Sequence, residues 1–119
     1  MNKLLFHPGD IIANVNFSPV TGHEQAKIRP ALIVSSADYQ RLTGLCVVVP
    51  ISSNTKPYPM HVPLDERTST YGCIYAEHPR AMDLVARQAV KKEECPQDIL
   101  DEVLKRVALI FPNTSYDID

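Results

Sequence analysis

The sequence predicts an α+β fold in which a partly open antiparallel β-barrel carries one short helix and one C-terminal helix. Short apolar runs rich in β-branched residues are separated by turn-forming residues along most of the chain. Ten prolines among 119 residues favour short elements joined by sharp turns. A long helical pattern occurs only near the C-terminus, and no strand–helix–strand alternation indicates a parallel sheet.

The first half of the chain contains two predicted strands and a short helix. Residues 9–17 form the first strand, and an interruption of its alternation near Ala13 and Asn14 indicates a β-bulge. Residues 29–34 form the second strand, which is apolar and β-branched. Residues 35–44 combine an N-capping serine with a terminal glycine, which is typical of a single short helix.

The centre of the sheet is predicted at residues 45–51, which are apolar on both faces. Pro50 is expected to end the regular pairing of this strand, because proline has no N–H to donate to a neighbouring strand. Weaker strand patterns follow at residues 60–64 and 73–76. The polar residues 65–72 form a solvated connection for which no order is predicted.

The C-terminal third is predicted to hold a short strand, a turn region and an amphipathic helix. Residues 81–85 form the strand, and residues 87–94 form a turn region that changes from basic to acidic. The helix begins near Pro96 and packs an apolar stripe on the sheet. This stripe comprises Ile99, Leu100, Val103, Leu104, Val107 and, at its end, Ile110. Residues 112–119 form a frayed polar tail.

Length and composition narrow the class of protein. We expect a single domain over residues 1–119, since this length suits one core. The net charge of −2 argues against a protein that coats nucleic acid without specificity. The three cysteines lie far apart without metal-binding spacing and are expected to be reduced thiols. No secretory signal and no membrane span is predicted, so we expect a cytoplasmic protein.

A polar junction leads into the second strand and is the first candidate site. Its charged and polar residues are His23, Glu24, Gln25, Lys27 and Arg29. Loops that are fixed to a rigid scaffold carry binding and catalytic residues more often than other surface does. The alternative interpretation is that Arg29 is a surface residue that pairs with Glu24.

Three patches now stand out together in order and spacing. They are Gly9–Ile12 with Phe17–Pro19, Gly22–Gln25 with Arg29–Leu32, and Val49–Ser52 followed by Gly72 and His78–Arg80. Over residues 9–111 the chain resembles the MazF/PemK (Kid) family of toxins from type II toxin–antitoxin modules. The family implies an SH3-like barrel related to that of CcdB, and a homodimer. It implies a ribosome-independent, metal-independent endoribonuclease that cuts single-stranded RNA at short sequences and leaves a 2′,3′-cyclic phosphate.

The resemblance also implies catalytic residues. Arg29 matches a catalytic arginine, and a guanidinium suits the phosphorane because it makes forked bonds to phosphate oxygens. Ser52 stands where relatives carry a threonine. Glu77 stands where PemK-like members carry an aspartate proposed as the base, and Glu24 is a further candidate. Tyr75 replaces an arginine proposed as the acid, so we prefer an assignment centred on Arg29 and Ser52.

Seven further residues are predicted to contact the RNA, and no metal ligand or cofactor is expected. They are His23, Gln25, Lys27, Ser53, Lys56, His78 and Arg80. The implied partners are single-stranded mRNA, a second copy of the chain and a cognate antitoxin of the MazE/PemI type. The extended C-terminal segment of that antitoxin is expected to occupy the RNA groove. Contact with DNA is expected only through the antitoxin, and contact with a membrane is not expected.

Two alternatives belong to other functional classes. The first is a binding poison of the CcdB type, which inhibits DNA gyrase and has no need of Arg29 and Ser52 in one groove. The second is a catalytically degenerate toxin that only binds its antitoxin. The departures at Ser52, Tyr75 and Ala13–Asn14 motivate this second alternative.

Overall fold

The computed structural model describes residues 4–17 and 28–113, so predictions for residues 18–27 and for the end of the tail lie outside the described chain. The described residues form seven strands and two helices. In chain order these are β1 (Asp10–Asn16), β2 (Ile28–Ile33), α1 (Ala37–Thr43), β3 (Cys46–Ser52), β4 (His61–Pro63), β5 (Cys73–Tyr75), β6 (Arg80–Met82), β7 (Val90–Glu94) and α2 (Gln97–Ala108).

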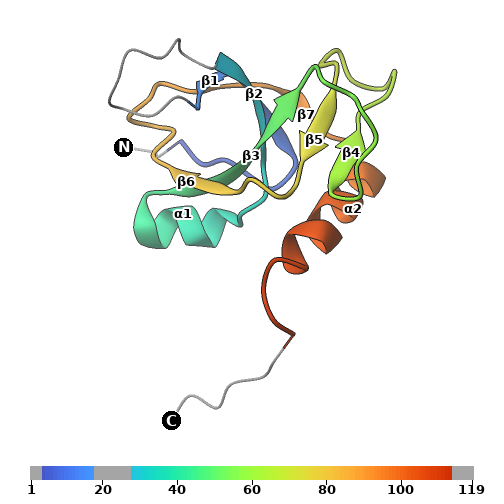
Figure 1. The fold of residues 1–119 in the computed structure, drawn as a ribbon. Helices are drawn as coiled ribbons and strands as arrows, with labels where there is room; N and C mark the ends of the chain where they lie inside the picture. The colour runs from blue at the N-terminus through green and yellow to red at the C-terminus, as the bar shows by residue number, and fades with distance from the viewer. Residues whose placement is uncertain (1–3, 18–27, 114–119) are drawn as a thin grey trace, which may run out of the picture.

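The strands form one mainly antiparallel, open sheet in the order β4-β5-β3-β2-β1-β7, and β6 pairs with β3 beside this path. Strand β3 is central, since β2 occupies one edge while the other edge is shared by β6 and then β5. Helix α1 lies near β3 and β6, and α2 lies beside β4 (Figure 1). This arrangement confirms the predicted α+β class with a partly open antiparallel sheet.

Each face of the sheet carries its own core cluster, because consecutive strand residues point to opposite sides. One cluster includes the apolar stripe of α2 and comprises Ile11, Leu32, Val49, Ile51, Val62, Ile74, Ala76, Ile99, Leu100 and Val103. The opposite cluster comprises Phe6, Ile12, Val15, Ala31, Ile33, Cys46, Val48, Met82 and Leu84. The predicted packing of the C-terminal helix on the sheet is therefore confirmed.

The predicted bulge in the first strand is present. The register between β1 and β2 shifts between Ile12 and Val15. Asn14 within this shift has a φ of 55°, a left-handed value that asparagine tolerates better than most residues. The extra residue lets both Ile12 and Val15 remain buried, and it sets Val15 opposite Arg29.

The short helix is capped as predicted. The Ser36 hydroxyl accepts a hydrogen bond from the Tyr39 amide at 3.2 Å. Gly44 ends the helix in the left-handed conformation, and its amide donates to the Gln40 carbonyl at 2.7 Å. The buried Gln40 side chain also accepts from the Phe6 amide at 2.8 Å, which ties the N-terminal segment to the helix.

Three predictions about the elements were wrong. Pro50 does not end β3, because it lies opposite Ala31 within the strand while the other edge of β3 changes partner from β6 to β5. Val90–Glu94 is not a turn but the edge strand β7, which pairs with β1. Ile110 lies two residues beyond the last helical residue and is 42% exposed, so it is not part of the buried stripe.

Candidate active site

Arg29 and Ser52 lie on the face of the sheet opposite α2. Ala31 of β2 faces Pro50 of β3, and the same register continued by two residues sets Arg29 across from Ser52. Residues directly opposite in an antiparallel pair share a face. The row continues to Cys73, which faces Ser52 from β5. The strand pairing therefore brings together two candidates that are separated by more than twenty positions in the sequence.

Arg29 borders two neighbouring depressions of the surface. The first has a volume of about 240 Å³ and is lined by Ile28, Arg29, Pro30, Ile51, Ser52, Ser53 and Tyr71. The second has a volume of about 260 Å³ and is lined by Phe17, Arg29, Pro50, His78 and Arg80. Four other predicted residues therefore line these depressions together with Arg29, namely Ser52, Ser53, His78 and Arg80.

The Arg29 guanidinium has no hydrogen bond or ion pair with another residue in the described ranges 4–17 and 28–113. Its side chain is partly exposed at the rim of both depressions. Such a cation is available to an anionic ligand, and a phosphate can accept two of its N–H groups at once. Glu24, the partner in the alternative interpretation, lies outside the described residues.

Ser52 is buried, with 7% of its surface exposed, and its hydroxyl oxygen accepts a hydrogen bond from the Asn54 amide at 3.1 Å. A serine hydroxyl can accept and donate at the same time. The contact with Asn54 fixes the oxygen and leaves the hydroxyl proton to donate. Ser52 can therefore act as an oriented donor toward a ligand beside Arg29.

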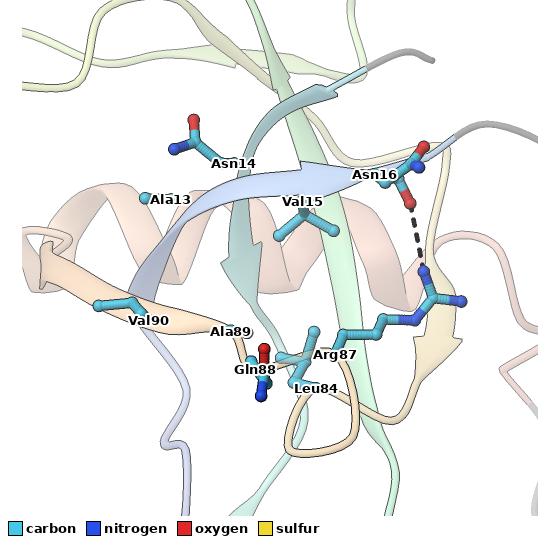
Figure 2. A pocket seen from close by; sticks show the side chains of 9 residues that line it. All are labelled: Ala13, Asn14, Val15, Asn16, Leu84, Arg87, Gln88, Ala89 and Val90. Carbon is cyan, nitrogen blue, oxygen red and sulfur yellow. Dashed lines mark hydrogen bonds between the residues drawn. The ribbon is translucent and has the colours of Figure 1, made fainter.

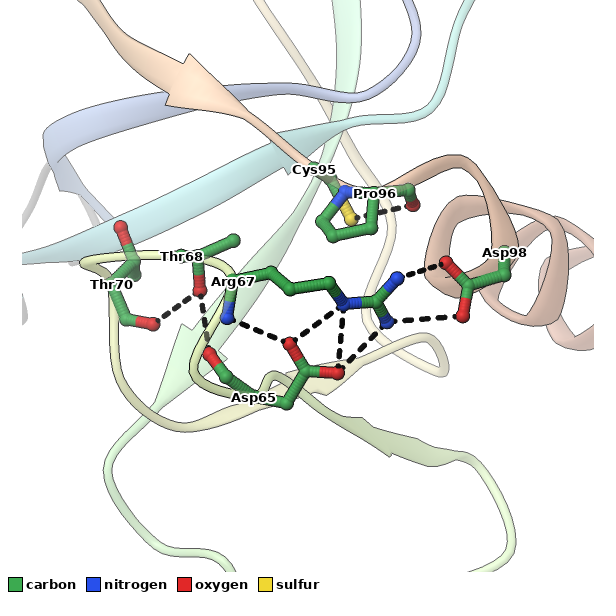
Figure 3. A network of polar contacts seen from close by, with 7 residues as sticks. All are labelled: Asp65, Arg67, Thr68, Thr70, Cys95, Pro96 and Asp98. Atoms are coloured by element: carbon green, nitrogen blue, oxygen red, sulfur yellow. Dashed lines mark hydrogen bonds and ion pairs between the residues drawn. The ribbon is translucent and has the colours of Figure 1, made fainter.

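Two networks hold the connection that carries Tyr71 into the first depression. The Arg67 guanidinium binds Asp65 and, at 2.8 Å, Asp98 of α2 (Figure 3). These hydrogen bonds lower the pKa of both carboxyl groups. No order was predicted for this segment, because Asp98 lies far along the sequence.

Glu93 of β7 forms the second network. Its carboxylate accepts hydrogen bonds from the amides and hydroxyls of Ser69 and Thr70, at 2.6 to 3.0 Å. Partial burial alone would raise the pKa of Glu93, but these hydrogen bonds outweigh it and lower the pKa to about 2. Since Tyr71 follows Thr70 directly, strand β7 helps to fix one wall of the site.

Arg80 and His78 form the far wall of the second depression. Arg80 donates to the Phe17 carbonyl at 2.7 Å, and its guanidinium carbon lies 5.8 Å from the centre of the Phe17 ring. The side chain of His78 is 62% exposed. Its Nε2 atom lies 3.8 Å from a carboxylate oxygen of Glu77, so Glu77 adjoins this depression through His78.

Glu77 belongs to a polar pair that the sequence did not indicate. Its Oε2 atom lies 2.7 Å from Nε2 of His61, and the His61 ring is stacked on Tyr75 with parallel planes and centroids 3.6 Å apart. The Tyr75 hydroxyl donates to the Asn54 carbonyl at 2.8 Å. No sequence signal indicated the pair, because it depends on the pairing of β4 with β5, which makes His61 and Tyr75 direct neighbours.

The remaining candidates do not join this group. Lys56 is exposed and lines neither depression, and its amide donates to the Asn54 side chain at 3.2 Å. His23, Glu24, Gln25 and Lys27 lie outside the described residues, so their predicted roles remain predictions.

A larger depression, of about 460 Å³, lies at the bulge of β1 and at the start of β7 (Figure 2). Its lining comprises Ala13, Asn14, Val15, Asn16, Leu84, Arg87, Gln88, Ala89 and Val90. The only ionisable side chain in that lining is Arg87, which donates to the Asn16 carbonyl at 3.5 Å. Because this lining offers no acid or base, we place the candidate active site around Arg29.

No group of three or more His, Cys, Asp or Glu side chains within residues 4–17 and 28–113 could hold a metal ion. Neither helix in these ranges is long and apolar enough to cross a membrane.

A family model described as "PemK-like, MazF-like toxin of type II toxin-antitoxin system" matches residues 7–111. Endoribonuclease PemK of Escherichia coli is 38% identical over 101 residues, which cover 82% of this chain and 76% of PemK. Endoribonuclease toxin MazF of E. coli K12 is 38% identical over 103 residues, which cover 87% of this chain and 91% of MazF. The chain therefore belongs to the PemK-like, MazF-like toxin family.

A solved structure supports the same assignment. In the MazE–MazF complex of Deinococcus radiodurans, one chain superposes with a TM-score of 0.79 and 35% identity. The match covers 91% of this chain and 96% of that chain. The predicted fold and the predicted family, whose named relatives are endoribonucleases, are thereby confirmed.

Proposed function

We propose that this chain is the endoribonuclease toxin of a type II toxin–antitoxin pair and that it cuts single-stranded mRNA at a short sequence without the ribosome and without a metal ion. The observation that carries the proposal is the position of Arg29, an ion-pair-free cation among the described residues, between two depressions and across from Ser52. The relatives named PemK and MazF endoribonucleases support the endoribonuclease activity.

In the proposed reaction the ribose 2′-hydroxyl loses its proton to a carboxylate, and its oxygen forms a bond to the adjacent phosphorus. The bond from phosphorus to the 5′-oxygen then breaks, and the departing oxygen takes up a proton. The products are a 2′,3′-cyclic phosphate and a 5′-hydroxyl. The protein must supply a base and positive charge for the phosphorane, and solvent water supplies the proton to the departing oxygen.

The residues around Arg29 suit these tasks. The Arg29 guanidinium stabilises the phosphorane with forked hydrogen bonds, and Ser52 donates to a phosphate oxygen. Glu77 is the candidate base, and Glu24 is the alternative candidate. Tyr75 does not serve as the acid, because its hydroxyl donates to a backbone carbonyl and its ring covers His61.

The exposed polar residues around the two depressions bind the RNA strand in this proposal. Ser53, His78 and Arg80 contact the nucleotides next to the cut, and Lys56 contacts the backbone further away. His23, Gln25 and Lys27 act from the junction before β2. Bases of single-stranded RNA are read by stacking and edge hydrogen bonds, so these loops determine the sequence that is cut.

A cognate antitoxin controls the activity in this proposal. The MazE–MazF complex of D. radiodurans supports a protein partner of the MazE or PemI type. We expect the antitoxin to cover the Arg29 surface and to make the only contact with DNA. We also expect a homodimer that acts in the cytoplasm, where mRNA is translated.

The test is cleavage of a long RNA of low structure by the purified protein in EDTA. Primer extension maps the cut sites, and mass spectrometry identifies the new 3′ ends. Cuts at one short sequence with 2′,3′-cyclic phosphate ends are expected. Intact RNA from a protein that still arrests growth would refute the nuclease and favour a gyrase-binding poison.

A further inference from the structure

His61 and Glu77 form a pair next to the candidate active site. His61 of β4 lies directly opposite Tyr75 of β5, and Tyr75 is two residues from Cys73, the neighbour of Ser52. Side chains that are opposite across strands, or two apart along one strand, share a face. The pair therefore lies on the same face as Ser52.

Three contacts fix the pair in this position. The His61 ring is stacked on Tyr75 with an angle of 1° between the planes. The Tyr58 ring packs on the His61 ring with 4.8 Å between the ring centroids. The 2.7 Å contact joins His61 Nε2 to Glu77 Oε2, so an ionised Glu77 accepts a hydrogen bond from Nε2–H. The side chains of His61 and Glu77 are only 12% and 25% exposed. Little freedom remains for the Glu77 carboxylate.

The pair is also incomplete, which distinguishes it from an ordinary structural hydrogen bond. His61 Nδ1 and Glu77 Oε1 are buried and have no hydrogen-bond partner among the described residues. Buried polar groups without a partner cost free energy, and their persistence calls for an explanation. A role of the pair in catalysis provides one.

We propose that His61 is a positioning residue of the nuclease and holds the Glu77 carboxylate in the orientation in which it takes the proton from the ribose 2′-hydroxyl. This inference rests on the proposed function. His61 makes and breaks no bond itself, since its Nε2 atom is used by Glu77. Tyr75 contributes by holding the His61 ring. This role explains why residue 75 is a tyrosine, although a tyrosine offers no positive charge to the phosphate.

The experiment is a double-mutant cycle on cleavage of a short fluorogenic RNA that carries the mapped cut sequence. The variants are Glu77→Gln, His61→Leu and the double variant, with His7→Leu as a matched control at an exposed histidine outside the site. Loss of a general base lowers kcat by about 10² to 10⁴. Misplacement of that base costs about 10² in kcat, which is the loss expected for His61→Leu.

The non-additivity of the cycle is the decisive readout. If His61 acts through Glu77, His61→Leu has no further effect on kcat once Glu77 is glutamine. KM stays within about twofold of wild type in each single variant. His61→Gln restores most of kcat, because the glutamine amide can donate to Glu77 as Nε2 does.

Two variants of Tyr75 test how the ring is held. Tyr75→Phe keeps the stack on His61 and loses only the bond to the Asn54 carbonyl, so a small effect on kcat is expected. Tyr75→Leu removes the stack and is expected to lower kcat in the direction of His61→Leu. Thermal unfolding of every variant identifies a temperature at which all are folded, and kcat is compared there.

Several results would overturn the inference. They are an unchanged kcat in Glu77→Gln, an equal loss from His61→Leu in both backgrounds, or a loss in His61→Leu that appears only in KM. The wild-type protein separates this outcome from failure of the proposed function. If wild type leaves RNA intact, the nuclease itself is refuted, whereas cleavage that depends on Arg29 but not on the pair refutes only the role of His61.

Discussion

Gly72 lies so close to Ser52 that a β-carbon at residue 72 would sit 2.3 Å from the Ser52 carbonyl oxygen. Gly72 also has a φ of 133°, a conformation that side chains rarely adopt. The connection of residues 65–72 can therefore pass directly over the end of β3. This approach links the position of Tyr71 to the candidate catalytic serine.

Gly72→Ala should disturb both the backbone and the site. Strain at φ and the contact with the Ser52 carbonyl are expected to lower the free energy of unfolding by about 2–4 kcal/mol. The measurement is urea unfolding. Gly44→Ala is the matched control, since Gly44 also has a positive φ but no atom within 4 Å of an added β-carbon. The control should cost about 1 kcal/mol from strain alone, and equal losses would contradict the close approach.

Glu93 should make stability depend on pH. Its pKa is about 2 in the folded protein against 4.5 for the free side chain, so its contribution is present above pH 4.5 and is lost as the pH falls toward 2. Glu93→Gln should therefore be less stable than wild type at neutral pH, with the difference shrinking through this range. Urea unfolding at several pH values measures it. Glu66→Gln, an exposed change in the same connection, should show no such trend, and a pH-independent effect at Glu93 would refute the network.

The hydroxyl of Ser52 should contribute more to RNA cleavage than the exact shape of its side chain. Ser52→Ala removes the donor and is expected to lower kcat for RNA cleavage by about a hundredfold, as loss of one transition-state hydrogen bond does. Ser52→Thr keeps the hydroxyl on a stiffer side chain and should remain active. Steady-state cleavage assays measure kcat for both variants. Full activity of Ser52→Ala would remove Ser52 from the reaction.

The elements that the sequence predicted well have strong local signals. Helix α2 repeats apolar residues at helical spacing, and Ser36 and Gly44 bracket α1 with recognisable caps. Strand β7 lacks such a signal, because Val90 is the only apolar residue among five and is itself exposed. An edge strand of this kind is held by backbone pairing with β1, which depends on tertiary structure.

The candidate site was predictable only in part, for a related reason. Arg29 and Ser52 follow from family resemblance and local chemistry, and the β2–β3 register brings them together. The contact of His61 with Glu77 spans sixteen residues and depends on the register of two three-residue strands. Short strands carry little periodicity, so sequence reasoning could not align His61 with the site.

The most direct test of the proposed active site replaces Arg29, the cation at its centre. Cleavage of an RNA with the mapped sequence is measured in EDTA for wild type, Arg29→Ala and Arg29→Lys. Arg87→Ala is the matched control, since Arg87 lines the larger depression at the bulge of β1. Thermal unfolding of each variant serves as the check of folding.

Loss of the guanidinium should lower kcat by at least about 10² to 10³, because the phosphorane loses its stabilising charge. Arg29→Lys should recover only part of kcat, since an ammonium lacks the forked geometry. Arg87→Ala should retain wild-type cleavage. A folded Arg29→Ala protein that still cuts RNA at the wild-type rate would contradict the assignment of Arg29 to the reaction.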